Sequence, residues 1–250
     1  MKLSLAWIFD HINADWKKQD INQIFSKFNT TTAEIEGFHK LKYDLQNFFL
    51  GKVVEHSNGK TKLLIPELKK EIELAQRKDE ADGMFAHIAN PVLMVKKIDT
   101  VFYWANLVDF GMEKEGLLPA FDVKEQDLAG NWRNKFESED IILEIDNKSI
   151  THRPDMWGHT GFAREIAMMM DLPFKDQSAF LKDITVQCFD GKSRATQTNP
   201  ITIENNVPDG CKRFTGLYFK SIENRPSNLF IASRLLKIGQ RPINGIIDLT

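Results

Sequence analysis

The feature that most limits the fold of this chain is a series of five short β-rich runs between Phe48 and Phe110. Each run is too short for an ordinary helix, and several are rich in β-branched or aromatic residues. Asn58-Gly59 has the composition of a two-residue hairpin turn, and Asp99-Thr100 separates the last two runs. Five short strands at hairpin spacing predict a small antiparallel barrel or sandwich. The runs are Phe48 to Glu55, Thr61 to Ile65, Met84 to Ile88, Val92 to Ile98 and Val101 to Val108.

The oligonucleotide-binding (OB) barrel is the five-stranded member of the small closed β folds, and it is the architecture predicted for this region. An unspecialised β-subdomain is the alternative that the pattern leaves open. The charged segment Glu67 to Asp82 is expected to form either a further strand or a helical excursion. Gly111 to Lys135, rich in glycine, proline and charge, is predicted to be a loop that covers one end of the barrel.

The flanking segments predict mixed α and β structure. Apolar residues at helical spacing, from Ile21 to Phe28, follow Asp20 as N-cap and indicate an amphipathic helix. Short strands are expected at Ala33 to Phe38 and at Ile141 to Ile145. The stretch from Ser149 to Ala167 reads as strand, turn and helix, with the helix running from Thr160 to a stop at Asp171-Leu172-Pro173.

A new domain is predicted to begin near residue 200, after a polar linker that holds one strand-like run, Ile184 to Phe189. Ile201 to Glu204 and Arg213 to Lys220 are strand-like, and Ser227 is expected to cap a helix that ends at Gly239. The final residues, from Ile246 to Thr250, read as an apolar strand that stops without a turn, as in a cut chain.

Composition limits the location and the partners of the chain. Its 250 residues contain 33 Lys and Arg against 35 Asp and Glu, a net charge of −2 that excludes coating of nucleic acid by bulk electrostatics but permits a local basic patch. The two cysteines, Cys188 and Cys211, cannot provide a disulfide framework or a cysteine-rich zinc site. The apolar run Leu3 to Phe9 is too short for a signal peptide or a membrane span. A cytoplasmic protein is expected.

Few residues have the spacing of a catalytic or metal site. His152, Asp155 and His159 cluster, but a structural role with Asp155 as helix cap is favoured, so no metal is predicted. Arg153, held extended by Pro154, could bind an anion through its planar fork, although an internal clamp between this arginine and the backbone is favoured. Arg164 and Glu165 are adjacent on a helix and are expected to bond elsewhere rather than to each other. We find no P-loop, no dinucleotide-binding glycine motif and no nucleophile elbow.

The predicted barrel carries a mixture of cations and aromatic residues that is typical of single-stranded nucleic-acid binders. Most of these aromatic residues are expected to belong to the core. The nucleic-acid candidates are Lys52, Lys60, Lys62, Lys96 and Lys97, and the aromatic residues are Phe48, Phe49, Phe85, Phe102, Tyr103 and Trp104.

Four segments resemble the phenylalanyl-tRNA synthetase β subunit, bacterial type, in the order in which that family carries them. Ile150 to Ala167, ITHRPDMWGHTGFAREIA, resembles the signature T-x-N-R-P-D followed by G-x-x-G-x-A-R-E, with His152 in place of Asn. Ala33 to Gly37 is similar to the G-x-E-V-E segment, and Cys211 to Gly216 is similar to C-x-R-Y-x-G. Leu235 to Thr250 resembles L-x-x-x-G-I-R-P-I-N-N-x-V-D-x-T-N-Y and ends within that motif. The signature residues, interpreted as structural, are Arg153, Pro154, Asp155, Gly158, Gly161, Arg164 and Glu165.

The resemblance implies an α+β multidomain architecture. A split αβ domain called B1 takes residues 1–40 and 149–182, an inserted OB-type B2 barrel takes 41–148, and the start of an α/β B3/B4 domain takes 200–250. The family's B2 barrel often carries an H-P-x-A-D-x-L run after its first strand, and Glu55 to Leu63 replaces it here. That departure concerns tRNA contacts by the barrel rather than its fold.

The resemblance also implies a function. The chain would be the amino-terminal part of the β subunit of phenylalanine–tRNA ligase, in which an α subunit attaches phenylalanine to its tRNA with ATP and Mg²⁺ in an (αβ)₂ assembly. This segment would hold no cofactor, no catalytic residue and no membrane contact, and alone it would be inactive. Thr250 and Arg241 would lie at the edge of a B3/B4 pocket that hydrolyses tyrosine wrongly attached to the tRNA. The alternative is a free-standing OB-fold module that binds nucleic acid or serves a structural role.

Overall fold

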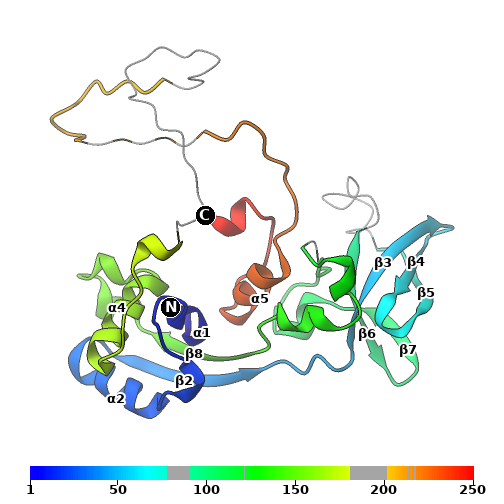
Figure 1. Ribbon diagram of the computed structural model, residues 1–250, viewed down its shortest axis with the longest axis horizontal. Coiled ribbons are helices and arrows are strands. Elements are labelled where there is room, and N and C mark those ends of the chain that lie inside the picture. The colour runs from blue at the N-terminus through cyan, green and yellow to red at the C-terminus, as the bar shows by residue number, and fades with distance from the viewer. Residues whose placement is uncertain (78–90, 121, 181–201, 213, 215, 217) are drawn as a thin grey trace. The chain divides into compact units, whose positions relative to one another are not determined.

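The computed structural model describes residues 1–77, 91–120, 122–180, 202–212, 214, 216 and 218–250 (Figure 1). The chain divides into two compact units, of which the first comprises Met1–Lys175 with Asn224–Thr250 and the second comprises Asp176–Glu223. The described part of the second unit contains one short 3₁₀ helix, Gln177–Phe180. The first unit contains all the other helices and strands described below.

An αβ layer in the first unit is assembled from two distant segments of the chain. Strand β8 (Glu139–Ile145) lies between β1 (Lys2–Ser4) and β2 (Ile35–Lys42), and both pairings are antiparallel. The helices α1 (Leu5–Phe9), α2 (Ile21–Thr31) and α4 (His159–Met170) share one apolar core with this sheet. The two segments therefore form one folded layer although almost a hundred residues separate β2 from β8.

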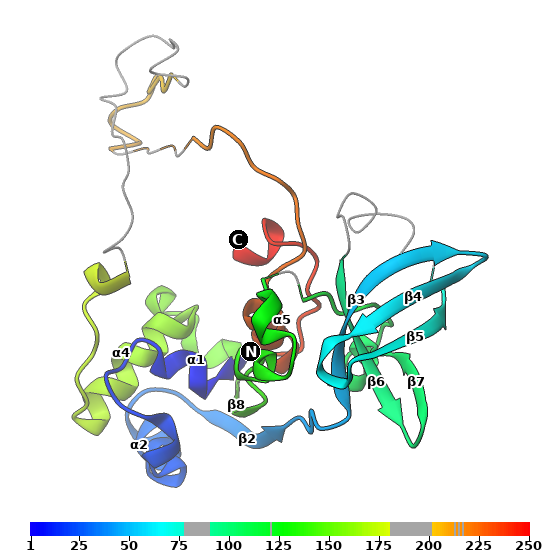
Figure 2. The same ribbon diagram turned by 45° about the vertical axis from the view of Figure 1, so that its right-hand side comes forward.

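The intervening chain forms a nearly closed five-stranded antiparallel sheet, which is compatible with the predicted OB-type barrel (Figures 1 and 2). The strand order is β5-β4-β3-β6-β7, and the Nε1 of Trp104 on β7 donates to the carbonyl of Ala75 on β5 at 2.8 Å. This bond joins the two strands at the open edges of the sheet. The strands are β3 (Phe48–Ser57), β4 (Lys60–Ile65), β5 (Lys70–Ala75), β6 (Val92–Ile98) and β7 (Val101–Trp104).

The segment after β7 packs against the barrel through short 3₁₀ helices rather than an open loop. Its Trp132 and Phe136 are buried in a core that also contains Leu50 of β3. Arg133 fastens it, because its guanidinium donates to the carbonyls of Leu45 and Phe48 and to the carboxylate of Glu67. The 3₁₀ helices here are Leu107–Phe110, Glu125–Asp127 and Asn131–Asn134; others are Trp16–Lys18, Pro66–Leu68, Asn147–Ile150, Pro154–Met156 and Ile247–Leu249.

Helix α5 (Leu229–Lys237) packs into the same core through Leu229, Ala232 and Leu236. The side chain of Asn228 caps it by accepting from the backbone N–H of Ile231, so the expected cap at Ser227 is wrong. Ser227 instead donates its hydroxyl hydrogen bond to Asp248. Gly239 follows the helix with a φ of 77°, the left-handed conformation that commonly ends helices.

Several local expectations are confirmed. Asp20 caps α2, and Asn58 and Gly59 have φ values of 51° and 70°, as a two-residue hairpin turn between β3 and β4 requires. The charged segment after Pro66 contains the strand β5, one of the two outcomes expected for it. The strand expected at Met84 to Ile88, like the run Ile184 to Phe189, lies outside the described residues.

Other local expectations are wrong. The residues before α4 form two 3₁₀ turns instead of a strand, because Pro154 starts a turn at its first helical position. The last residues form a 3₁₀ turn instead of a strand, since the carboxamide of Asn244 accepts from the N–H groups of Ile246 and Ile247. The described residues 202–204, 214, 216 and 218–220 are not in strands, and β7 ends at Trp104 rather than Val108. In the described ranges, helices with the length and apolar character of a membrane span are absent.

Candidate functional site

The family-signature segment forms a cluster of ion pairs at the start of α4. Arg153 donates from Nε and Nη2 to both carboxylate oxygens of Asp155, at 3.0 and 2.9 Å, and also to Glu165. Arg164 donates to Asp155 at 2.8 Å. The hydrogen bond from Arg153 lowers the pKa of Asp155 to about 2, and the same bond raises the pKa of Arg153. Arg153 is therefore an internal clamp whose fork is occupied by carboxylates.

This cluster settles three expectations about the segment. Arg164 and Glu165 do bond to different partners, as predicted from their adjacent positions on the helix. Asp155 does not cap α4: the N-cap residue is Gly158, which has no side chain, and Asp155 bonds the two arginines instead. The expected clamp on Arg153 is made to side-chain carboxylates rather than to backbone.

Gly161 allows the closest backbone approach at this site. A Cβ atom on Gly161 would lie 1.9 Å from the carbonyl oxygen of Asp155 and 2.9 Å from the Cα of Met156. Both are backbone atoms of the preceding 3₁₀ turn, so no rotation of a side chain could relieve the overlap. The glycine lets the turn that holds Pro154 and Asp155 lie directly against the first turn of α4.

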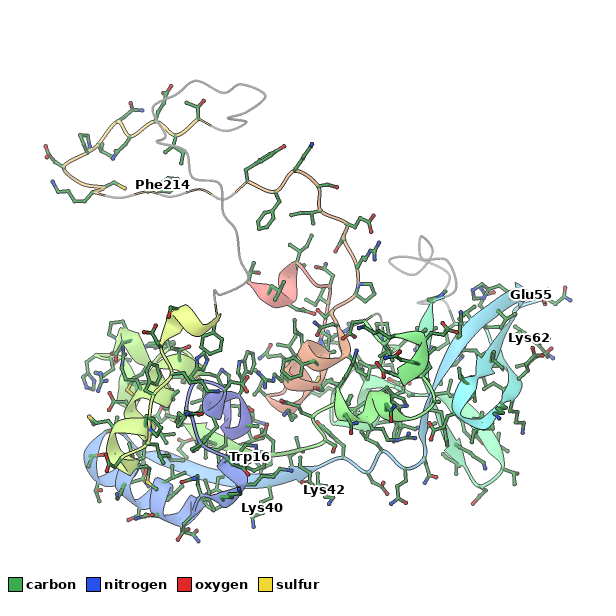
Figure 3. All side chains as sticks on the ribbon, viewed as in Figure 1. Trp16, Lys40, Lys42, Glu55, Lys62 and Phe214 are labelled. Atoms are coloured by element: carbon green, nitrogen blue, oxygen red, sulfur yellow. The ribbon has the colours of Figure 1, made fainter. Side chains whose placement is uncertain are left out.

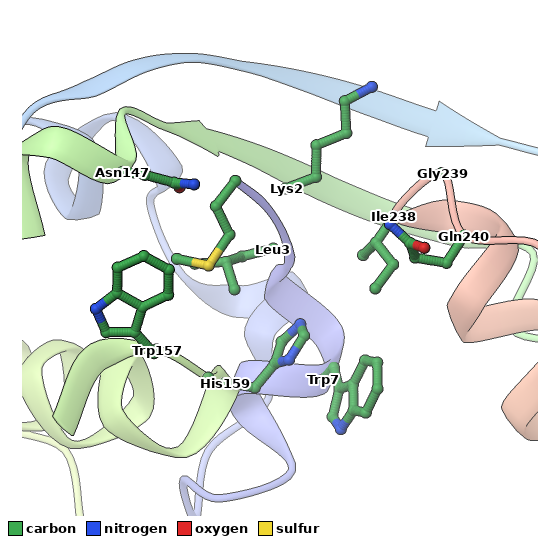
Figure 4. A pocket seen from close by; sticks show the side chains of 11 residues that line it. Lys2, Leu3, Trp7, Asn147, Trp157, His159, Ile238, Gly239 and Gln240 are labelled. Carbon is green, nitrogen blue, oxygen red and sulfur yellow. The ribbon is translucent and has the colours of Figure 1, made fainter. Parts of the chain in front are cut away.

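Two of the predicted motifs border one open hollow of about 630 Å³ (Figure 4). Trp157, Gly158 and His159 come from the signature, whereas Ile238, Gly239 and Gln240 come from the motif after α5. The remaining lining residues are Met1, Lys2, Leu3, Trp7 and Asn147. Segments that are far apart in the sequence thus meet at the start of β1.

His159 is a buried titratable group that lines this hollow. Its ring stacks on Trp7 with the centroids 4.1 Å apart, and its Nε2 accepts a hydrogen bond from the backbone N–H of Ser4 at 3.2 Å. Burial, and then the nearby charge of Arg234, lower the pKa of His159 to about 4. His159 is therefore neutral at physiological pH.

We expect the stability of the chain to fall as the pH drops from about 6.5 toward 4, in part through His159. The unfolded state binds a proton near pH 6.5, whereas the folded state resists protonation until about pH 4, so acid favours unfolding. Each unit of pKa difference corresponds to about 1.4 kcal/mol. Urea midpoints at pH 7 and pH 4.5 should differ less for His159→Gln than for the unchanged chain. An equal pH dependence in both would contradict this assignment.

An ionic network with a buried centre, Arg234, Lys237 and Asp140, joins α5 to the αβ layer. Its members are Asp10, Glu137, Asp140, Arg234 and Lys237. Lys237 donates to Asp140 at 2.7 Å and to Glu137 at 2.8 Å, and the side chains of Lys237 and Asp140 are both 0% exposed. Arg234 bonds Glu137 and Asp10. Burial alone would raise the pKa of Glu137, but the hydrogen bonds from Arg234 and Lys237 outweigh burial and leave this pKa lowered.

The five predicted barrel lysines do not form one exposed basic patch. Lys52 pairs with Glu125, Lys60 with Glu73, Lys62 with Glu71 and Lys96 with Asp109. Figure 3 shows Lys62 at the surface of the barrel. Lys97 differs, because its ammonium group lies 6.0 Å from the centroid of the Phe102 ring. Four of the five candidates thus have a carboxylate partner within the protein.

The barrel aromatic residues are mostly core residues, as expected. Phe49 and Phe102 are 7% and 8% exposed and belong to the barrel core, with Trp104 partly buried against it. Phe48 packs against the neighbouring core. Tyr103 is 46% exposed, and Phe85 lies outside the described residues.

The candidates at the carboxyl end are Arg241 and Thr250. Arg241 is exposed, and its guanidinium lies near Gly116 in the segment that covers the barrel. Thr250 is exposed and donates its hydroxyl hydrogen bond to the carbonyl of Ile247. Their assignment to an editing pocket stays a prediction.

Sequence reasoning missed Arg234 and Lys237 of the ionic network, and Lys70, whose ammonium group lies 5.4 Å from the centroid of the Phe102 ring. Arg234 and Lys237 occupy polar positions of the amphipathic helix α5, so the sequence pattern does not distinguish them from solvent-exposed cations. Lys70 lies in the charged segment whose strand was only one of two expected outcomes. Once β5 is known to be a strand, the alternation of Lys70, Ile72 and Leu74 indicates that these three side chains share one face of it.

Comparison with known proteins extends the resemblance to the whole chain, although no family model matches it. A phenylalanine–tRNA ligase β subunit from Solibacter usitatus is 40% identical over 111 residues, which cover 44% of this chain and 13% of the relative. The β subunit from Leptospira biflexa is 27% identical over 269 residues, and that from Fusobacterium nucleatum is 24% identical over 273 residues. Each of these two matches covers 100% of this chain and 32% of the relative, so the chain spans about a third of their length. The resemblance indicated by the four motifs is confirmed: along its whole length the chain is similar to β subunits of phenylalanine–tRNA ligase.

Proposed function

We propose that the chain is part of a phenylalanine–tRNA ligase β subunit and supports the ATP-dependent attachment of phenylalanine to its tRNA by an α subunit. The observation that carries this proposal is the similarity of the entire chain to β subunits of that ligase. In the proposed (αβ)₂ assembly the α subunit holds ATP and Mg²⁺. Among the residues that the structure describes, no group of three or more His, Cys, Asp or Glu could hold a metal ion.

The proposed domains follow the family. B1 combines residues 1–40 with 149–182, B2 takes 41–148, and B3/B4 begins near 200. The pairing of β8 with both β1 and β2 supports a split B1, because it joins the two segments in one sheet. The nearly closed five-stranded sheet between them supports an OB-type B2. We place Arg241 and Thr250 at the edge of a Tyr-tRNA editing pocket in B3/B4.

We propose a weak contact between the barrel and tRNA. Paired ammonium groups such as those of Lys60 and Lys62 contribute little to phosphate binding, because their charge is already balanced. The chain alone should bind tRNA near the nonspecific range, with a Kd of about 10⁻⁴–10⁻⁶ M, and without preference for the phenylalanine acceptor. Salt titrations with two different tRNAs check this. Tight binding that discriminates between the tRNAs at high salt would contradict it.

Purification of the complete gene product from its own cells tests the ligase role. It should recover a synthetase α subunit in equal amount, and the purified complex should attach phenylalanine to tRNA when ATP and Mg²⁺ are added. The 250-residue chain alone should do neither this nor Tyr-tRNA hydrolysis. The alternative, a free-standing nucleic-acid-binding module, predicts a purified product that binds oligonucleotides but brings no α subunit and shows no aminoacylation.

A further inference from the structure

The described lysines on the five strands of the barrel fall into two classes. Lys52, Lys60, Lys62 and Lys96 each have a carboxylate oxygen within 4.0 Å, whereas the described structure gives Lys70 and Lys97 no such partner. Salt bridges between exposed groups are weak, but they still cancel the net charge that a passing phosphate would meet. A phosphate-binding site on this barrel is therefore expected at the lysines that lack a carboxylate.

Lys70 and Lys97 converge on one aromatic ring although they come from different strands. The ammonium group of Lys70 on β5 lies 5.4 Å from the centroid of the Phe102 ring, and that of Lys97 on β6 lies 6.0 Å from it. Phe102 on β7 is directly opposite Lys97 in the strand register. The ring attracts both cations but carries no net charge, so both positive charges remain beside one ring without a carboxylate partner.

The alternation of side chains keeps the acidic residues of β5 away from this pair. Lys70, Ile72 and Leu74 share one face of the strand, and Ile72 is buried in the barrel core. Glu71 and Glu73 point to the other face, where they pair with Lys62 and Lys60. On β6, Lys97 likewise continues the row of Leu93 and Val95, which belong to the same core. The two lysines therefore lie where the inward-facing rows of the barrel end.

We propose that Lys70 and Lys97 form a binding site for the phosphate backbone of single-stranded nucleic acid. Lys70 belongs to β5, at the edge where β5 meets β7, and Lys97 belongs to β6, the neighbour of β7. The proposal rests on the contact with tRNA that is proposed above. Two cations that share one aromatic ring and lack a carboxylate partner suit phosphodiester oxygens. Phe102 is 8% exposed, so it orients the cations and does not stack on a base. The site is therefore expected to bind nucleic acid without preference for its base sequence.

The experiment compares two double variants that change the net charge equally. Lys70→Ala with Lys97→Ala removes the proposed site, and Lys60→Ala with Lys62→Ala removes two paired lysines of the same barrel. The probe is a fluorescein-labelled oligouridylate about 12 nucleotides long, within the roughly 4–16 nucleotides that one OB-type barrel covers. Its fluorescence anisotropy is followed during titration at several chloride concentrations. Equal urea midpoints confirm that both variants are folded.

The first double variant should bind roughly tenfold more weakly at low salt, and its slope of log affinity against log salt should be shallower by about 1.4. The second should keep the slope of the unchanged chain. Equal losses in both variants, or the larger loss in the second, would overturn the proposal. Displacement of the probe by inorganic phosphate at constant ionic strength would also overturn it, because the site would then hold free phosphate.

These outcomes are separate from the ligase role. If the unchanged chain does not bind the probe at low salt, the phosphate site is refuted, while recovery of an α subunit with the complete gene product still supports the ligase role. If the probe binds through Lys70 and Lys97 but no α subunit is recovered, the phosphate site stands and the ligase role fails.

Discussion

Gly161→Ala should lower the free energy of unfolding by about 3 kcal/mol, at the upper end of the roughly 1–3 kcal/mol that overpacking usually costs. The new Cβ would overlap the carbonyl oxygen of Asp155, 1.9 Å away, and only a shift of backbone could make room for it. In an ordinary helix the same substitution is favourable by about 1 kcal/mol, because alanine is the better helix former. A lower free energy of unfolding for Gly161→Ala would therefore result from the overlap with Asp155 and not from helix propensity.

Gly158→Ala is the matched control for this substitution. Gly158 also belongs to the signature, but its φ of 178° is extended backbone that any residue adopts, and a Cβ there would meet nothing within 4 Å. Urea unfolding should show a lower midpoint for Gly161→Ala and little change for Gly158→Ala, with equal slopes. If both variants unfold at the midpoint of the unchanged chain, the close approach of the turn to α4 is wrong.

Lys237→Met should destabilise the chain by about 3 kcal/mol, the lower end of the roughly 3–5 kcal/mol expected when one partner of a buried pair is removed. The substitution keeps most of the apolar stem but leaves the wholly buried carboxylate of Asp140 without its cation. The hydroxyl of Ser4 and the backbone N–H groups of Ala6 and Ile141 still donate to Asp140, which limits the loss.

Lys42→Met is the matched control for this second substitution. Lys42 pairs with Glu139 at 2.7 Å, but its side chain is 75% exposed, and ion pairs between exposed groups contribute little to stability. Urea unfolding of both variants should separate them clearly. A further check is limited proteolysis, since loss of the ionic network should expose the chain around α5 to cleavage before the rest unfolds. Similar midpoints for the two variants would show that the network contributes no more than a surface pair.

The parts of the fold that were predicted correctly depend on short-range chemistry. Asp20 accepts hydrogen bonds from Asn22 and Gln23, and Asn58-Gly59 adopts the positive φ angles of a hairpin turn, because both features need only neighbouring residues. The turn at Pro154 was misread because a proline can follow a strand or begin a 3₁₀ turn equally well, and only the packing of Gly161 decides between them.

The candidate site was harder to predict because it depends on the strand register. Lys62 and Lys97 are equivalent cations in the sequence, but Lys62 lies near Glu71 across the β4–β5 pair, whereas Lys97 lies opposite Phe102. The buried position of Lys237 could not be predicted for a related reason. Its position on an amphipathic helix indicates a solvent-exposed cation, and only the buried Asp140 of a distant strand makes it a core residue.

The discontinuous sheet has a consequence for the order of events during synthesis. At roughly 5–20 residues per second, β2 leaves the ribosome several seconds or more before β8, the strand that both β1 and β2 require. Every strand of the barrel is made in that interval, so the barrel can close first. The backbone N–H of Tyr43, which follows β2, donates to the carbonyl of Ser138, which precedes β8, at 2.8 Å. A folded barrel would thus place the start of β8 next to the end of β2. Until then the apolar residues of β1 and α1 stay exposed on the nascent chain, which makes this segment a natural substrate for a chaperone.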